Sequence, residues 1–159
     1  MIWRVCIQRG FRLTNQMLSD LRAAGKYEGA SRAFGLSMRR GVDLFAREVV
    51  DIRNVCALFF RRAADQRLDG VRVDVSCVFV GHGRHDPDAG HLAIKALVDG
   101  MVDAGFLSSD RRDVRWTRGL VAQSRDDLEG LPSPALAPGW RGVVVEVSEV
   151  LEAKGASHG

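Results

Sequence analysis

The chain has 159 residues, of which 46% are hydrophobic and 27% are charged, a balance that predicts one compact domain with its own core. No stretch resembles a signal peptide or reaches the roughly 20 apolar residues of a membrane span, so we expect a cytoplasmic protein. Cys6, Cys56 and Cys77 each stand in an apolar run and share no metal-ligand spacing. They predict buried thiols in a reducing compartment.

The basic residues are mostly arginine: 20 arginines stand against three lysines, at a formal net charge of only +3. The guanidinium group is a rigid, permanently charged fork that matches phosphate oxygens, so this bias favours a nucleic-acid partner. A GC-rich coding sequence would explain the same bias.

The N-terminal half predicts a strand, a polar arm, a long helix and a second strand. Apolar and polar residues alternate over 2–8. Residues 9–40 form an arginine-rich arm punctuated by glycines, with one short helical stretch near 17–24. A helix is expected over 41–68, and alternation over 71–80 predicts the next strand. The apolar face of the long helix is expected to contain Val42, Phe45, Val49, Ile52, Cys56, Phe59 and Ala63.

The C-terminal half predicts a second helix over 90–104 and short strands over 114–117 and 143–147. A proline-containing loop separates these two strands, and residues 148–159 are expected to form a flexible tail. The order of elements indicates a single α/β domain in which a mixed β-sheet packs against two main helices.

A polar segment lies between the strand over 71–80 and the second helix. Asp86 and Asp88 flank Pro87, whose ring restricts the backbone so that the two carboxylates can converge near a helix start. Oxygen-rich sites of this kind suit Mg²⁺ or Mn²⁺. Either aspartate could instead cap the helix that follows.

The second helix carries polar residues in a pattern that is otherwise apolar nearly all round. Lys95 and Asp99 lie one turn apart on one face, and His91 lies one turn earlier. Because a buried ammonium is costly without partners, we expect Lys95 to point towards acidic groups or a bound phosphate. A simple ion pair between Lys95 and Asp99 is the other interpretation. Asp110 follows the helix and reaches the first two carboxylates if its strand lies beside 71–80.

Five arginines flank this segment and are expected to grip DNA phosphates, which would position a duplex without reading its sequence. They are Arg84, Arg111, Arg112, Arg115 and Arg118.

The histidines offer a second interpretation of the segment. His82, His85 and His91 lie within ten residues, which is close enough to suggest a zinc site, with Asp86 as a further ligand. Against zinc, His85 and Asp86 are sequence neighbours that are expected to point apart, and no cysteine completes the set.

The spacing of these polar residues resembles the signature of the RusA family of Holliday-junction resolvases. The matching features are Asp86-x-Asp88, Lys95, Asp99-Gly100, Asp103-Ala104-Gly105-Phe106 and Asp110. The close match covers residues 86–110, and elsewhere the likeness lies only in the order of elements. Two positions depart from the family pattern: Ala89-Gly90 replaces its usual Asn-Leu, and Ser109 stands where it often has a second acid.

The resemblance implies a RusA-like fold and a Mg²⁺-dependent endonuclease, with Mn²⁺ as a substitute ion. By this resemblance Asp86, Asp88 and Asp110 would bind the metal, and Lys95 would contact the scissile phosphate. The substrate would be a four-way DNA junction, cut twice by a homodimer in a bacterial or phage-infected cell. The alternative is a DNA-binding or assembly protein that keeps the fold and has little or no turnover.

Overall fold

The computed structural model describes residues 1–11, 34–62, 67–68, 70–84 and 89–151; for residues 34–46 and for Leu92 it describes the backbone only. Several predictions therefore lie outside the described residues. They include most of the expected arm (residues 12–33) with its short helical stretch near 17–24, the side chains of Val42, Phe45 and Ala63 on the expected long helix, the side chains of His85, Asp86 and Asp88, and most of the expected tail, from residue 152 onwards.

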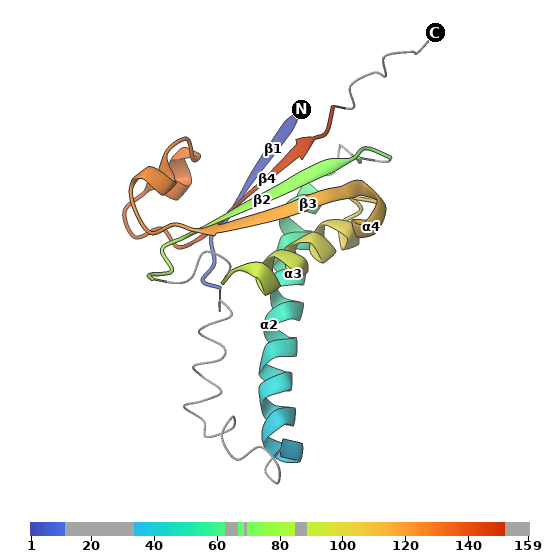
Figure 1. Ribbon diagram of the computed structural model, residues 1–159, viewed down its shortest axis with the longest axis vertical. Coiled ribbons are helices and arrows are strands. Elements are labelled where there is room, and N and C mark those ends of the chain that lie inside the picture. Colours follow the sequence, from blue (N-terminus) through green and yellow to red (C-terminus); the bar gives the residue numbers. More distant parts are fainter. Residues whose placement is uncertain (12–33, 63–66, 69, 85–88, 152–159) are drawn as a thin grey trace.

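The centre of the fold is a four-stranded mixed sheet with the order β1-β4-β2-β3 (Figure 1). β1 (Ile2–Ile7) pairs antiparallel with β4 (Gly142–Glu149), and β4 pairs antiparallel with β2 (Val73–Val80). β3 (Val114–Val121) runs parallel to β2 and forms one edge of the sheet. Because parallel neighbours need a crossover, the chain passes from β2 to β3 through a helix.

Two long helices lie against one face of this sheet: α2 (Phe34–Arg62) and α3 (His91–Asp103). α2 extends well beyond the sheet, and α3 runs beside β3 and ends near the short α4 (Asp110–Asp113) (Figure 1). The main core lies between the sheet and these helices. Its largest fully buried side chains are Phe60, Phe79, Phe106, Ile7, Ile52, Leu97, Met101 and Leu107.

The opposite face of the sheet is covered in part by the connection between β3 and β4. This connection contains two short 3-10 helices, η1 (Asp126–Leu128) and η2 (Ser133–Leu136). It forms a second, smaller core in which Ala135 and Trp140 pack against the sheet. The N-terminal half of β3 lies outside this cover, and its residues 115–118 are exposed.

The prediction of a single α/β domain with a mixed sheet is confirmed, whereas several boundaries were wrong. α2 begins at Phe34, so the last residues of the expected polar arm are helical, and it ends at Arg62 rather than 68. Leu68 instead forms an isolated β-bridge with Leu107. The expected helix was too long because the sequence has no glycine or proline between Arg62 and Leu68, whereas Asp69-Gly70 follows directly.

The buried face of α2 also differs from the prediction. Phe60 is fully buried, whereas Phe59 is 36% exposed. The reason is the crossing of α3, whose Gly100 lies against Cys56 and Ala57 and so turns that side of α2 inward. A β-carbon on Gly100 would meet the backbone of α2, so only glycine permits this close approach.

The apolar surface of the two long helices is largely used within the monomer. Both apolar sides of α3 are used within the monomer, one against the sheet and one against α2. Phe60 is likewise part of the monomer core. The exposed large apolar residues that remain on the described part of α2 are Val50, Leu58 and Phe59.

The last two strands are both longer than expected. β3 continues to Val121, because Arg118 and Gly119 break the apolar alternation without ending the pairing with β2. β4 continues to Glu149, so Ser148 and Glu149 belong to the sheet and not to a flexible tail. The amide of Val150 also donates a hydrogen bond to the carbonyl of Arg72 (2.8 Å).

The cysteines are free thiols, as predicted, but only two of them are buried. Burial raises the pKa of Cys77 to about 12, and it also raises the pKa of Cys56, whose Sγ donates to the carbonyl of Leu97 (3.1 Å). Cys6 is half-buried, because it lies on the thinly covered face of edge strand β1.

Among the described helices, none combines the length and the apolar character that crossing a membrane requires.

Candidate functional site

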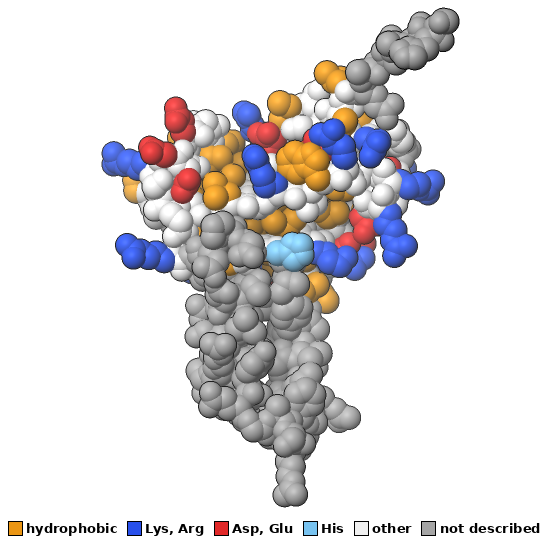
Figure 2. All heavy atoms as spheres, viewed as in Figure 1, with side chains coloured by type: hydrophobic (Ala, Val, Ile, Leu, Met, Phe, Trp, Pro, Cys, Tyr) orange, Lys and Arg blue, Asp and Glu red, His pale blue; other side chains and the backbone are white. Residues whose placement is uncertain are grey.

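A groove of about 330 Å³ runs between α3 and the edge strand β3. α3 contributes a stripe at i, i+4 spacing, His91, Lys95 and Asp99, and β3 contributes residues from its exposed first half. Figure 2 shows basic, acidic and histidine side chains gathered over these elements. The lining residues are His91, Ile94, Lys95, Val98, Asp99, Asp110, Val114, Arg115, Trp116 and Thr117.

Glycines allow the elements around the groove to approach closely. The side chain of Ile94 on α3 fills the space beside Gly119 on β3, and the ring of Phe79 fills the space beside Gly90 at the start of α3. At the other end of α3, Gly105 has a φ of +72° and ends the helix, as the sequence predicted. α3 is therefore fixed against the sheet, with its polar stripe and the neighbouring Ile94 and Val98 lining the groove.

Lys95 is not buried, which corrects the expectation from the sequence. Its side chain is 69% exposed, and its Nζ lies 3.9 Å from Asp99 Oδ2. The apolar residues on both sides of Lys95 are buried, but Lys95 itself faces the open groove beside an edge strand. The ion pair with Asp99 is therefore weak, worth roughly 0.2–0.5 kcal/mol for an i, i+4 pair. The Lys95 ammonium can reach a ligand at little cost in desolvation.

Asp110 lies at the first position of α4 and borders the same groove. Ser109 caps this short helix: its Oγ accepts a hydrogen bond from the amide of Arg112 (3.4 Å). β3, which follows α4, lies directly beside β2, so the strand arrangement that the sequence required for Asp110 is present.

Asp113 was missed by the sequence analysis, and it fixes the turn that carries Asp110. It is only 4% exposed, and its Oδ2 accepts hydrogen bonds from the Ser108 amide (2.9 Å), the Ser108 hydroxyl (2.6 Å) and the Ser109 amide (2.9 Å). Burial raises the pKa of this carboxyl, but the hydrogen bonds from Ser108 and Ser109 outweigh burial and lower it overall. The Ser108-Ser109 pair was the available signal, because such residues often bond a nearby carboxylate in turns.

Asp103, which belongs to the RusA-like pattern, has a structural role here. Its carboxylate forms a bidentate ion pair with Arg53 of α2, including an Oδ1 contact of 2.7 Å to Nη2. The hydrogen bond from Arg53 lowers the pKa of Asp103. This ion pair ties α2 to the last turn of α3.

The structure describes only some of the carboxylates expected at the site. Asp99 and Asp110 line one groove, whereas Asp86 and Asp88 lie outside the described residues. Asp99 is thus a candidate ligand beside Asp110. Within the described ranges, no three His, Cys, Asp or Glu side chains group closely enough to hold a metal ion.

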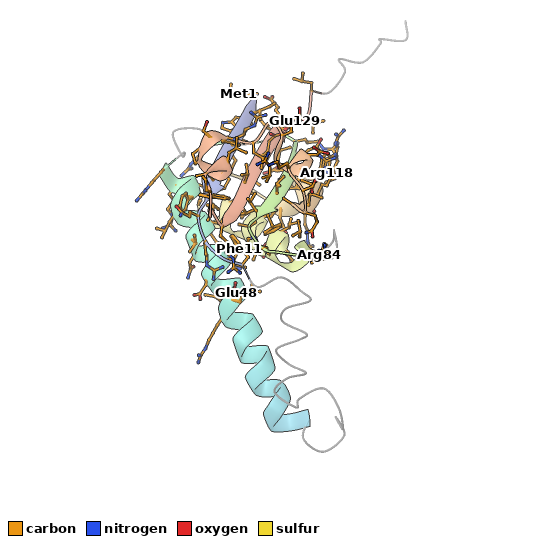
Figure 3. All side chains as sticks on the ribbon, turned by 90° about the vertical axis from the view of Figure 1, so that its left-hand side faces the viewer. Met1, Phe11, Glu48, Arg84, Arg118 and Glu129 are labelled. Carbon is orange, nitrogen blue, oxygen red and sulfur yellow. The ribbon has the colours of Figure 1, made fainter. Side chains whose placement is uncertain are left out.

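The five arginines expected to grip DNA differ in their surroundings. Arg84, Arg111 and Arg112 are exposed, and Arg84 and Arg118 lie on the same side of the molecule (Figure 3). Arg115 forms a bidentate ion pair with Asp74, with a distance of 2.9 Å from Nε to Oδ1, and Asp74 is only 13% exposed. The guanidinium of Arg115 is therefore held on the sheet and is less available to phosphate.

Arg118 lies over the ring of Trp116, at 5.8 Å from the ring centroid. Trp116, which was not among the predicted site residues, is 40% exposed on β3 and borders the groove. In the sequence, Trp116 is marked only as a large aromatic residue that stands between an arginine and a threonine in a strand.

His82 does not fit the zinc interpretation. It is buried between Phe11 and Phe79, and its Nε2 accepts a hydrogen bond from the Phe11 amide (3.0 Å). That nitrogen is therefore unavailable to a metal ion. His91 lies on the groove, and His85 lies outside the described residues.

Comparison of the chain with protein-family models, with curated proteins and with solved structures found no match. The residues of the groove are therefore the basis on which a function can be assigned.

Proposed function

We propose that this protein is a Mg²⁺-dependent, structure-specific endodeoxyribonuclease that resolves four-way DNA junctions, as the RusA-like spacing of its polar residues implies. The observation that carries the proposal is the meeting of an exposed lysine and two carboxylates, Lys95, Asp99 and Asp110, in one groove. Exposed arginines lie on the adjoining elements. An ammonium beside carboxylates suits the cleavage of a phosphodiester, because the substrate is anionic and its anionic charge increases as the bond breaks.

The donor atoms of the groove are compatible with magnesium. Mg²⁺ is commonly held by one or two carboxylates, several waters and substrate phosphate oxygens, without a complete protein cage. In the proposal Asp86, Asp88 and Asp110 hold the ion, and Asp99 is a further candidate because it lines the same groove as Asp110. Such an ion supplies an activated water and neutralises charge on the leaving oxygen.

The protein's own side chains would position the phosphate. Lys95 carries a fixed positive charge on an exposed, flexible side chain, and it can move from Asp99 to a phosphate oxygen without losing a strong interaction. Arg84, Arg111 and Arg112 would bind phosphates on either side of the scissile one. Asp113 would keep Asp110 in place through its hydrogen bonds to the preceding turn.

The proposed working form is a homodimer. Resolving a four-way junction needs two opposed cuts, and two sites related by a two-fold axis match the symmetry of the junction. Val50, Leu58 and Phe59 are exposed apolar residues of α2, and in the proposal a second copy covers part of this helix. Sedimentation at micromolar concentration tests this: the dimer should sediment at twice 17.5 kDa, and a monomer with and without junction DNA would rule it out.

A DNA-binding protein without turnover is the second candidate. It is favoured by the fact that, among the described residues, only two carboxylates line the groove. Both candidates predict binding that weakens steeply with salt, so binding alone does not separate them.

The experiment that separates them uses a labelled four-way junction and a matched linear duplex, each with Mg²⁺ or with EDTA. The nuclease should cut the junction in Mg²⁺ only and leave the duplex intact. Binding of the junction without cleavage in Mg²⁺ or Mn²⁺ would favour the DNA-binding alternative.

A further inference from the structure

Trp116 is a large aromatic side chain whose exposure the protein's own packing does not explain. Of the three tryptophans, Trp140 is buried in the smaller core, and Trp3 packs edge-on against Phe106 with ring centroids 5.9 Å apart. Trp116 remains 40% exposed on the free edge of the sheet. Aromatic rings exposed in this way are typical of binding surfaces.

The surroundings of Trp116 are basic. In the sheet register Trp116 is opposite Asp74 and Arg118 is opposite Ser76, so the two side chains share the face of the sheet away from α3. Arg118 lies over the ring, and Arg115 is the preceding residue. Figure 2 shows apolar side chains bordered by Lys and Arg over β3. Because the guanidinium of Arg115 is paired with Asp74, the cation that the ring itself contacts is Arg118.

Because β3 is the edge strand, Trp116 also borders the groove that contains Lys95 and Asp110, although its side chain starts from the other face of the sheet. A nucleic-acid strand that places a phosphate at Lys95 would thus bring its neighbouring nucleotides to the edge of β3. Arg118 is positioned to bind the phosphate of such a nucleotide while its guanidinium holds the ring of Trp116 in place.

We propose that Trp116 is a stacking platform for an unpaired nucleobase next to the scissile phosphate. This inference rests on the proposed function, because the strand is the one that the groove would bind. Stacking on an aromatic ring accepts any base, since every base has a π-face. Proteins that bind single-stranded DNA combine such rings with cationic side chains, which Arg118 and Lys95 supply here. The ring would make the site select DNA whose bases are unpaired at a branch point.

The charge of the surface favours DNA over a second copy of the chain. A protein contact centred on Trp116 would bring Arg118 and its neighbours under cover and would require acidic partners for them. Nucleic acid supplies a phosphate for each base, so a base can stack on the ring while the phosphates pair with the arginines. The exposed apolar residues that suit a contact between copies, Val50 and Leu58, lie on α2 instead.

Tryptophan fluorescence tests the stacking directly. The full chain is titrated with a four-way junction in EDTA, so that no strand is cut. Stacking of a base on the indole quenches its emission, and the wild-type protein should therefore lose emission on binding. Trp116→Phe should remove most of this loss while retaining most of the affinity. Quenching that is equal in wild type and Trp116→Phe would overturn the inference.

Affinity provides the second readout. Trp116→Ala should weaken junction binding about tenfold, within the range that stacking of one base supplies. Leu136→Ala is the matched control, because Leu136 is a 50% exposed apolar residue on η2, and it should bind as wild type does. Unchanged affinity of Trp116→Ala would overturn the stacking role. A change from dimer to monomer in Trp116→Ala would also overturn it, since the ring would then belong to the contact between copies.

The outcomes of these measurements distinguish the stacking role of Trp116 from the proposed nuclease function. Quenched binding without cleavage in Mg²⁺ would overturn the nuclease and support the platform. Normal cleavage and binding by Trp116→Ala would overturn the platform alone. Absence of junction binding by the wild-type protein would overturn both.

Discussion

The side chain of Ile94 on α3 occupies the space that a β-carbon on Gly119 of β3 would fill. Gly119 thereby lets the helix lie close to the edge strand, and Ile94 is itself a lining residue of the groove. The width of the candidate site thus depends on a contact between two residues without polar side chains, Ile94 and Gly119. Packing of this kind leaves little freedom, because protein interiors are close-packed.

Gly119→Ala should therefore destabilise the fold by roughly 1–3 kcal/mol through overpacking. Ile94→Val removes Cδ1, the atom nearest the added β-carbon, and should alone cost about 0.5–1.5 kcal/mol. The double variant should be more stable than the sum of the two single effects predicts, as measured by urea unfolding. Simple additivity would mean that the two positions do not meet in the way described.

Asp113→Asn should destabilise the protein by about 1–3 kcal/mol at neutral pH, because the Ser108 and Ser109 donors lose a charged acceptor. The pKa of Asp113 is lowered by folding, so its stabilising effect is present above the unfolded pKa of about 3.9 and is lost as pH falls through the folded pKa. Denaturation followed between pH 7 and pH 2 should show the wild-type advantage shrinking at acid pH.

Asp110→Asn is the matched control for stability, because it makes the same chemical change at the first position of the same helix. It should alter stability by no more than about 0.5 kcal/mol, as is usual for a site away from buried networks. Equal destabilisation by both substitutions would contradict the different roles of the two residues, in which Asp113 stabilises the turn and Asp110 lines the groove.

The class of fold could be predicted from the sequence because its main elements carry strong periodic signals. The strand ending at Val80 alternates regularly, and α3 is apolar over most of its surface. α4 has only four residues, which is too short for any period to appear. Its position depends on the hydrogen bonds of Asp113, for which the Ser108-Ser109 pair is only a weak sequence signal.

The candidate site could be predicted only in part. The stripe of Lys95 and Asp99 follows from helical spacing, but the exposure of Lys95 depends on the neighbouring strand being an edge of the sheet. The same holds for Trp116, since alternation along a strand does not reveal which face is left uncovered. The ion pair of Arg115 with Asp74 joins residues 41 positions apart, and local sequence carries no signal for it.

Lys95→Ala should lower the rate of cleavage about 10²–10³-fold, the range found when one preorganised group that stabilises transition-state charge is removed. Junction binding should fall much less, because a single phosphate contact is lost. Asp99→Asn should have a small effect if Asp99 only pairs with Lys95, and a large one if it binds the metal. Single-turnover cleavage and binding in EDTA measure the two effects separately, and a loss confined to binding would remove Lys95 from the reaction.

Replacing Arg111 and Arg112 together by alanine should reduce the dependence of log K for the junction on log salt by about two units, if each contacts one phosphate. Arg61 and Arg62 form the control pair, because they are adjacent, exposed and located on the last turn of α2. Their replacement changes the net charge equally and should leave the slope as it is. Equal slopes in the two double variants would place the DNA surface elsewhere.

The proposed nuclease activity is most directly tested by mapping the cuts that the protein makes in a four-way junction with each strand labelled in turn. In Mg²⁺ we predict paired cuts in two opposed strands of like polarity, no cuts in EDTA, and an intact linear duplex. Asp88→Asn and Asp110→Asn should abolish the cuts while binding stays intact or becomes tighter, because each removes a metal ligand and some repulsion towards phosphate. Retention of nearly full Mg²⁺-dependent cutting by both variants, or equal cutting of junction and duplex, would contradict the account.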